Sequence, residues 1–171
     1  MRIPIVDEND EIIEYKEREE RTATDTCRIT SVFVFNSSGE FLIAQRQFTK
    51  TIDPGKWGPF VAGTVEEGET YDSNAVKELG EELGITGIVP VFFKKFFYKT
   101  ENAQWFNSVY IVHIDKPAED FMIQKEEVVQ VRWISLDELV QWHRKSPDDF
   151  VPSFQNVIDR IKEYESQSKK A

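Results

Sequence analysis

The chain has 171 residues, 40% of them hydrophobic and 13% aromatic, which is enough for one well-packed domain and too few to suggest two. The formal net charge of −10 argues against a general nucleic-acid or anionic-membrane surface, because either partner would be repelled. One cysteine, Cys27, excludes an intramolecular disulfide, and the sequence contains neither a signal peptide nor an apolar run of membrane-spanning length, so we expect a cytoplasmic protein.

The first part of the chain predicts an edge hairpin followed by a surface segment. Residues 3–6 and 11–15 have the composition of two short strands joined by a polar turn. Residues 16–25 are densely charged and show no apolar stripe, which indicates a connector. We expect residues 1–25 to form the N-terminal hairpin and connector of a single domain that spans residues 1–171.

A second, central hairpin is predicted from residues 29–35 and 41–44, with a turn at 36–39. Bases gather after it, and Arg46, Lys50 and Lys56 are candidate phosphate-binding residues because cations on a strand end and loop can converge on a diphosphate. An equally good interpretation of each is a solvated surface base.

Two aromatic residues follow within a segment rich in glycine and proline. We expect Trp57 and Phe60 to pack beneath this loop, with stacking on a nucleobase as the alternative.

Residues 63–85 contain a dense acidic pattern on a predicted helix over residues 70–83. Seven acidic residues against the single base Lys77 give a charge of −6 over residues 66–82. Helical spacing predicts that Glu82 lies inside the buried arc, Glu78 on its rim, and Glu81 on a wetter side beside Glu78. Gly84 has the position of a helix C-cap. The expected apolar arc consists of Tyr71, Ala75, Val76, Leu79 and Leu83.

Carboxylates at the edge of a core need a cation beside them or raised pKa values, because desolvating an ionised carboxylate is costly and adjacent ones repel. Hard oxygen ligands at this spacing suit Mg²⁺ or Mn²⁺ when the ion keeps waters and shares its remaining positions with phosphate. The alternative is an ordinary solvated acidic helix face.

The spacing of the acidic segment resembles the Nudix box, the signature of enzymes that hydrolyse a nucleoside diphosphate linked to another moiety. The box begins at Gly63, has Glu69 six positions later, and continues as KELGEELGI over residues 77–85. Eight of the nine defined positions match, and Lys77 stands where the family has arginine. Lysine keeps the charge but lacks the planar fork of arginine.

The resemblance implies an α/β/α sandwich around a mixed β-sheet, with the box as a loop-helix-loop at the edge of the sheet. It implies that Glu78, Glu82 and the Gly63 carbonyl bind Mg²⁺, or alternatively Mn²⁺, and that Glu81 shares a metal or helps deprotonate water. It further implies that Glu69 braces the loop against the helix, while Lys77 pairs with a box glutamate.

The remainder of the chain predicts further strands and two helices. Strands are expected at residues 88–93, 96–98, 105–114 and 128–134, a polar loop at 116–121, a short helix capped by Ser135, a helix over 152–164 and a flexible tail at 166–171. Glu126 and Glu127 precede a strand and are either solvent-facing or accessory to the metal, as a late glutamate is in the Nudix family. His113 and His143 lack ligand-spaced partners, which makes a zinc site improbable.

The resemblance implies an Mg²⁺-dependent hydrolase that cleaves the diphosphate linkage of a nucleoside diphosphate derivative or a related small diphosphate. We expect it to act as a monomer or homodimer without nucleic-acid or membrane partners. The first half of the chain also resembles the isopentenyl-diphosphate isomerase branch of the superfamily. That isomerase needs a cysteine and a metal-binding histidine around the position of Gly63, where this chain has Ala62 and Thr64. An isomerase-like enzyme and a non-catalytic nucleotide or diphosphate binder are the alternatives.

Overall fold

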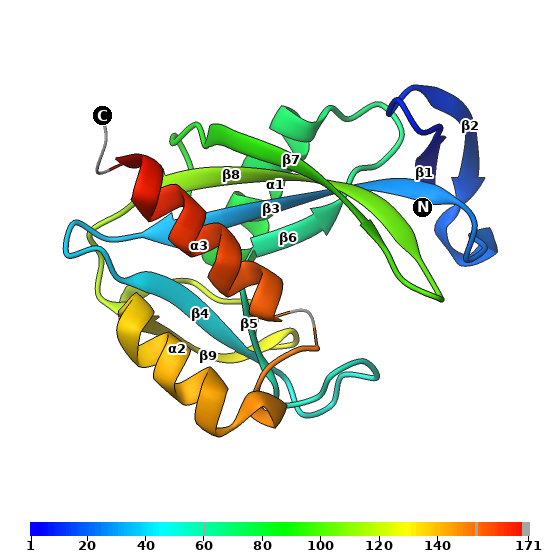
Figure 1. Ribbon diagram of the computed structural model, residues 1–171. Helices are drawn as coiled ribbons and strands as arrows, with labels where there is room; N and C mark the ends of the chain where they lie inside the picture. The colour runs from blue at the N-terminus through cyan, green and yellow to red at the C-terminus, as the bar shows by residue number, and fades with distance from the viewer. Residues whose placement is uncertain (60, 153, 169–171) are drawn as a thin grey trace. The chain divides into compact units, whose positions relative to one another are not determined.

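Nine strands and three α-helices are formed by the residues that the computed structural model describes, which are 1–59, 61–152 and 154–168 (Figure 1). The strands belong to a mixed sheet, and the mixed α and β architecture predicted from the sequence is confirmed. The chain divides into two units, of which the first comprises Met1–Val32, Val61–Glu81 and Ile85–Val112, and the second comprises Phe33–Phe60, Glu82–Gly84 and His113–Ala171.

The first unit contains the N-terminal hairpin and most of the acidic helix. β1 pairs with both β2 and β3, β6 also pairs with β3, and β7 pairs with β8. Its elements are β1 (Arg2–Val6), β2 (Ile12–Glu17), the 3-10 turn η1 (Arg18–Glu20), β3 (Thr26–Phe35), β6 (Val61–Thr64), α1 (Tyr71–Leu83), β7 (Val91–Lys99) and β8 (Gln104–His113).

Alternation along β3 separates two chemical environments within this unit. Ile29 pairs with Thr64 and Thr30 pairs with Gly63 across the β3–β6 ladder. Because neighbouring side chains on a strand point to opposite faces, Thr30 faces α1 while Ile29 faces away from it. On the face of Ile29, a buried apolar cluster forms from Ile3, Ile5 and Cys27, with Ile29 and Trp105 packed against it.

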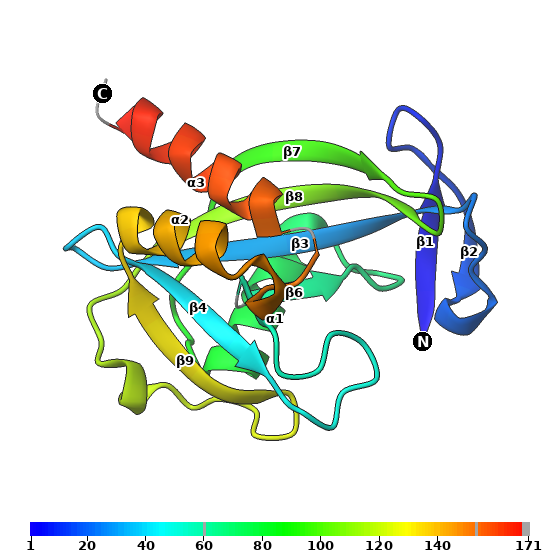
Figure 2. The ribbon, with the colours of Figure 1, turned by 60° about the horizontal axis from the view of Figure 1, so that its bottom comes forward.

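The second unit is organised around β4, which pairs antiparallel with β5 and β9, as Figure 2 shows for β4 and β9. The helix α2 begins at the expected N-cap, where the Ser135 hydroxyl and the Glu138 side chain form a reciprocal capping box. The elements are β4 (Phe41–Arg46), β5 (Trp57–Pro59), η2 (Ala118–Asp120), β9 (Val128–Ile134), α2 (Leu136–Lys145), η3 (Pro147–Asp149) and α3 (Phe154–Ser168).

Several expected boundaries are wrong. The two strands predicted at residues 88–93 and 96–98 are one continuous strand, β7, which begins at Val91 and has a register shift between Phe92 and Lys94. The C-terminal helix extends to Ser168, so residues 166–168 are helical where a flexible tail was predicted. The hydroxyls of Ser166 and Ser168 donate to the carbonyls of Glu163 and Tyr164 there. Residues 169–171 and Phe60 lie outside the described residues.

Trp57 is buried and lies in β5, where its ring meets Trp142 edge to face. Among the described residues, no helix has the length and apolar character needed to cross a membrane.

Candidate active site

Gly63 and Glu78 are in direct contact within the first unit. β6 ends just after Gly63, and α1 places Glu78 so close that a Cβ on residue 63 would lie 2.0 Å from its Oε1 atom. No side chain larger than hydrogen fits at residue 63 unless Glu78 moves. The glycine at the start of the box therefore leaves room for Glu78 in its observed position.

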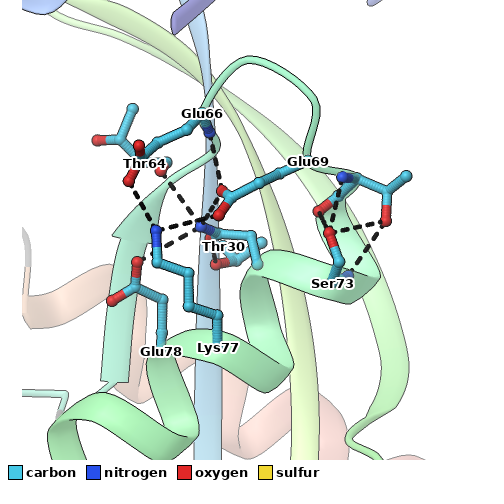
Figure 3. A network of polar contacts seen from close by, with 9 residues as sticks. Thr30, Thr64, Glu66, Glu69, Ser73, Lys77 and Glu78 are labelled. Carbon is cyan, nitrogen blue, oxygen red and sulfur yellow. Dashed lines mark hydrogen bonds and ion pairs between the residues drawn. The ribbon is translucent and has the colours of Figure 1, made fainter. Parts of the chain in front are cut away.

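An ion-pair brace holds the loop before α1. Lys77 Nζ lies 2.6 Å from Glu66 Oε1 and 3.0 Å from Glu69 Oε1. The second oxygen of Glu69 accepts a hydrogen bond of 2.9 Å from the backbone N–H of Glu66. Figure 3 shows Lys77 and Glu78 extending from α1 toward the segment that carries these two acids. The structure thus brings the one base of the acidic segment against two of its glutamates.

Asn74 lies at the centre of this network and is fully buried. Its amide nitrogen donates to Glu69 Oε2 at 2.8 Å, to the Thr64 carbonyl at 3.2 Å and to Glu78 Oε1 at 3.4 Å. Its amide oxygen accepts from the Thr30 hydroxyl of β3. One side chain therefore ties β3 to Glu69 of the loop and to Glu78 of α1.

The environment shifts the pKa values of these carboxyls in opposite directions. Burial raises the pKa of Glu78; the adjacent Lys77 charge lowers it and the Glu81 charge raises it again, with a net increase. Burial also acts to raise the pKa of Glu69, but hydrogen bonds from Glu66 N–H, Lys77 and Asn74 hold it below the usual value. The hydrogen bond with Glu66 raises the pKa of Lys77. Hydrogen bonds thus stabilise the ionised form of Glu69, whereas burial disfavours the ionised form of Glu78.

The other residues of the predicted site on α1 follow the helical spacing with one exception. Glu82 and Glu78 are half-buried and Glu81 is exposed, as expected. Val76 was predicted in the apolar arc. This prediction is wrong, because the Val76 side chain is 43% exposed while Ala75, Leu79 and Leu83 are fully buried. The buried stripe is narrower than predicted, and Val76 lies outside it.

Gly84 follows the end of α1 with a φ of +65°, a left-handed conformation that favours glycine. A Cβ there would lie 2.7 Å from the Met122 side chain, so both the backbone and the packing require glycine. The backbone N–H of Ile85 donates to the carbonyl of Leu79 at 3.3 Å and closes the helix.

The donors of this segment fit a divalent cation in chemical type. Carboxylate and carbonyl oxygens are the ligands that Mg²⁺ takes. Burial, with a smaller effect of the Glu81 charge, raises the pKa of Glu78, and a cation beside it would stabilise the ionised carboxylate. Within the described residues, no three acidic, histidine or cysteine side chains converge as a ready-made ligand set. Glu81 is exposed, so the fit rests on Glu78 beside Gly63 rather than on a preformed cage.

The predicted phosphate-binding bases lie in the second unit, on β4 and the loop that follows it. Arg46 Nε donates to the Ile52 carbonyl at 3.1 Å, and the backbone N–H of Arg46 donates to the Lys56 carbonyl at 2.9 Å. Lys50 forms an ion pair with Glu127, and Lys56 Nζ lies 4.0 Å from Asp53. A phosphate that binds Lys50 must therefore compete with Glu127.

Of the two late glutamates, the structure gives a defined position to Glu127. Besides pairing with Lys50, its carbonyl accepts from the backbone N–H of Gln47 at 2.8 Å, so it fastens the loop after β4. Glu126 is exposed.

The NUDIX domain family model matches residues 25–154 of the sequence. The chain belongs to the Nudix family. The match begins at the end of the charged connector and includes the whole box, so the resemblance stated from the box is confirmed. These comparisons do not confirm the more specific likeness to the isomerase branch.

A curated relative covers nearly the whole of this Nudix chain. It is the uncharacterized Nudix hydrolase SCO1686 of Streptomyces coelicolor, 32% identical over 171 residues, which cover 97% of this chain and 91% of the relative. Relatives carrying the Nudix hydrolase name support the assignment of this chain as an enzyme that hydrolyses phosphoric anhydrides.

Solved structures share the fold. The crystal structure of DR0079 from Deinococcus radiodurans has a TM-score of 0.78 at 21% identity, covering 94% of this chain and 99% of the other. The NUDIX domain of Shewanella oneidensis NrtR, solved with ADP ribose, has a TM-score of 0.63 at 15% identity, covering 93% and 99%.

Sequence reasoning missed Asn74 and Thr30 altogether. Asn74 occupies a helix position four residues before Glu78, on the same face, and a polar amide at that spacing was the available signal. Thr30 gave no signal, because a threonine within a β-branched strand is typical of sheet packing.

Proposed function

We propose that this chain is an Mg²⁺-dependent Nudix pyrophosphohydrolase that cleaves the diphosphate linkage of a nucleoside diphosphate derivative or a related small diphosphate. Mn²⁺ is the alternative ion. The single observation that carries the proposal is the contact between Glu78 and Gly63, in which a half-buried carboxyl with a raised pKa lies against a backbone that has no side chain to block it.

The proposed ligands of the ion are Glu78, Glu81 and Glu82 of α1 together with the carbonyl of Gly63. When bound, the ion would lower the pKa of a coordinated water and neutralise charge on the phosphates. Glu81 or Glu78 would accept the proton of the attacking water. The exposed position of Glu81 leaves its carboxylate accessible to solvent water.

The remaining polar residues of the network hold these carboxylates in place. Glu69 and Lys77 fix the loop that leads into α1, and Asn74 touches Glu78 from the buried side. We further propose that Arg46, Lys50 and Lys56 bind substrate phosphate, with Glu127 as the partner that Lys50 gives up on binding. Glu126 and Glu127 remain the predicted accessory acids.

The alternatives differ in their chemistry. Ala62 and Thr64 flank Gly63, so the cysteine and histidine that the isomerase requires are absent from those two positions. A non-catalytic binder is favoured by one observation, since a NUDIX domain of the same fold was crystallised with ADP ribose. Against it, all the acids of the box are retained in this sequence.

The test is an incubation of the protein with Mg²⁺ and a panel containing nucleoside diphosphate sugars, ADP-ribose, dinucleoside polyphosphates, nucleoside triphosphates and isopentenyl diphosphate. Release of nucleotide or phosphate that requires Mg²⁺ is the expected result. Formation of dimethylallyl diphosphate would replace the hydrolase by the isomerase, and tight binding without turnover across the panel would replace it by the binder.

Other aspects of the assignment remain predictions from the sequence. They are the interpretation of residues 1–171 as one domain, a cytoplasmic location, and a monomer or homodimer as the active form.

A further inference from the structure

A pocket of about 260 Å³ lies in the first unit on the face of β3 and β6 that points away from α1. Ile29 and Thr64, which face each other across the β3–β6 ladder, both line it. Thr30 and Gly63, the neighbours of these two residues, belong to the opposite face and to the network around Asn74. The pocket is therefore distinct from the carboxylate site, although the two share one strand pair.

Two arginines are among the residues that line this pocket. Arg18 is the first residue of η1 and Arg21 is its C-cap. Arg21 Nη1 donates to Cys27 Sγ at 3.1 Å, a weak acceptor for a charged donor. Among the residues that the structure describes, no carboxylate pairs with either guanidinium, although Asp and Glu outnumber Lys and Arg by 31 to 21. Two guanidinium groups in such an acidic chain leave ten donor hydrogens without an anionic acceptor.

The pocket is also lined by apolar and aromatic side chains. Ile3 belongs to the buried cluster, and the partly buried Ile29 and Trp105 pack against that cluster. Trp105 stacks on Tyr98, with ring centroids 5.8 Å apart and planes 27° from parallel. This stacking fixes the indole, so that a planar group can pack against it with little loss of side-chain entropy.

We propose that this pocket is a second ligand site, which binds a small monophosphate carrying a planar ring, of the nucleoside monophosphate class. The phosphate would lie against Arg18 and Arg21, whose forked donors match its geometry. The ring would pack over Trp105 and the isoleucines. The volume lies just below the usual range for ligand pockets, which favours a mononucleotide over a dinucleotide. The site does not depend on the metal or on the hydrolase reaction.

The test measures tryptophan fluorescence of the full chain in a chelating, metal-free buffer, titrated with AMP, CMP, GMP and UMP. Adenosine without phosphate and inorganic phosphate alone serve as the ligand controls. We expect quenching by at least one nucleotide, weakened by salt, and absent in W105F, a variant that keeps an aromatic ring in the fold.

Arg18→Gln is the decisive variant. Arg18 is exposed, and the hydrogen bonds described for it are formed by its backbone, so the substitution should leave the fold intact. We expect R18Q to weaken nucleotide binding about tenfold, as loss of one charge-assisted contact does. The matched control is R144Q, which removes the same charge from an exposed position on α2 and should bind like the wild type. R18Q should also retain Mg²⁺-dependent turnover, so failure of this site and failure of the hydrolase assignment are separate results.

Three outcomes would overturn the second site. One is the absence of nucleotide binding by the metal-free wild type in the millimolar range. Another is equal affinity of R18Q and R144Q. The third is binding of inorganic phosphate as tight as that of every nucleotide, which would leave the aromatic platform without a role.

Discussion

Replacing Asn74 by alanine removes the side chain that ties β3 to the acidic loop. The lost bonds include one of 2.8 Å to the Glu69 carboxylate and one of 3.2 Å to the Thr64 carbonyl. A hydrogen bond to a charged group contributes about 1.5–3 kcal/mol, and a buried hydroxyl left without an acceptor costs about 1–3 kcal/mol. The hydroxyl in question belongs to Thr30, which is fully buried.

Alanine recovers a few tenths of a kcal/mol through its higher helix propensity, so the expected loss for N74A is about 2–4 kcal/mol in the free energy of unfolding. Urea unfolding of the metal-free protein, followed by circular dichroism, measures it. The matched control is V76A on the same helix, where the side chain is exposed and the expected change is below about 0.5 kcal/mol.

A second substitution separates the hydrogen-bond argument from simple loss of packing. In the N74A background, Thr30→Val removes the stranded hydroxyl at nearly constant shape, and we expect it to restore part of the lost stability. If N74A unfolds within about 0.5 kcal/mol of the wild type, or if T30V lowers the stability of N74A further, the role given to this network is wrong.

Three other substitutions test neighbouring parts of the box. G63A should displace Glu78, whose flexible end would meet the new Cβ, and lower turnover at least tenfold while thermal unfolding changes little. K77M should cost about 1–2 kcal/mol at neutral pH. Burial acts to raise the pKa of Glu69, but its hydrogen bonds hold that pKa below the value in the unfolded chain. The stability that these bonds contribute is therefore lost as the pH falls below about 4.3. The difference in unfolding free energy between K77M and wild type should shrink at that pH in urea titrations. G84A should lower the stability by at least about 1 kcal/mol in the same assay, because the backbone at residue 84 is left-handed.

Much of this fold could be predicted from local patterns. The N-terminal hairpin, the strand at 128–134 and the capping box at Ser135 were predicted because turn residues, alternation and cap spacing are properties of adjacent residues. The short strands β5 and β6 were missed. Three or four residues with glycine among them carry no period of their own, and these strands exist through pairing with β4 and β3.

The site shows the same division. The helical spacing of α1 predicted which glutamates are half-buried and which is exposed, since burial around a helix follows its period. The same spacing could not predict that Glu78 touches Gly63 or that Asn74 reaches Thr30, because these contacts join residues whose proximity is created by the packing of α1 on β3 and β6. The two arginines beside Trp105 were likewise invisible in the sequence, where 84 positions separate Arg21 from Trp105.

The most direct test of the proposed hydrolase measures kcat/KM with Mg²⁺ for the best substrate of the panel, in the wild type and in Glu82→Gln. This variant keeps the size of the side chain and removes its charge, so circular dichroism and thermal unfolding should match the wild type. We predict a loss of at least about a hundredfold in kcat/KM, as removal of a metal-binding charge implies. Turnover by E82Q equal to that of the wild type, at every Mg²⁺ concentration, would contradict the assignment of the box as the catalytic site.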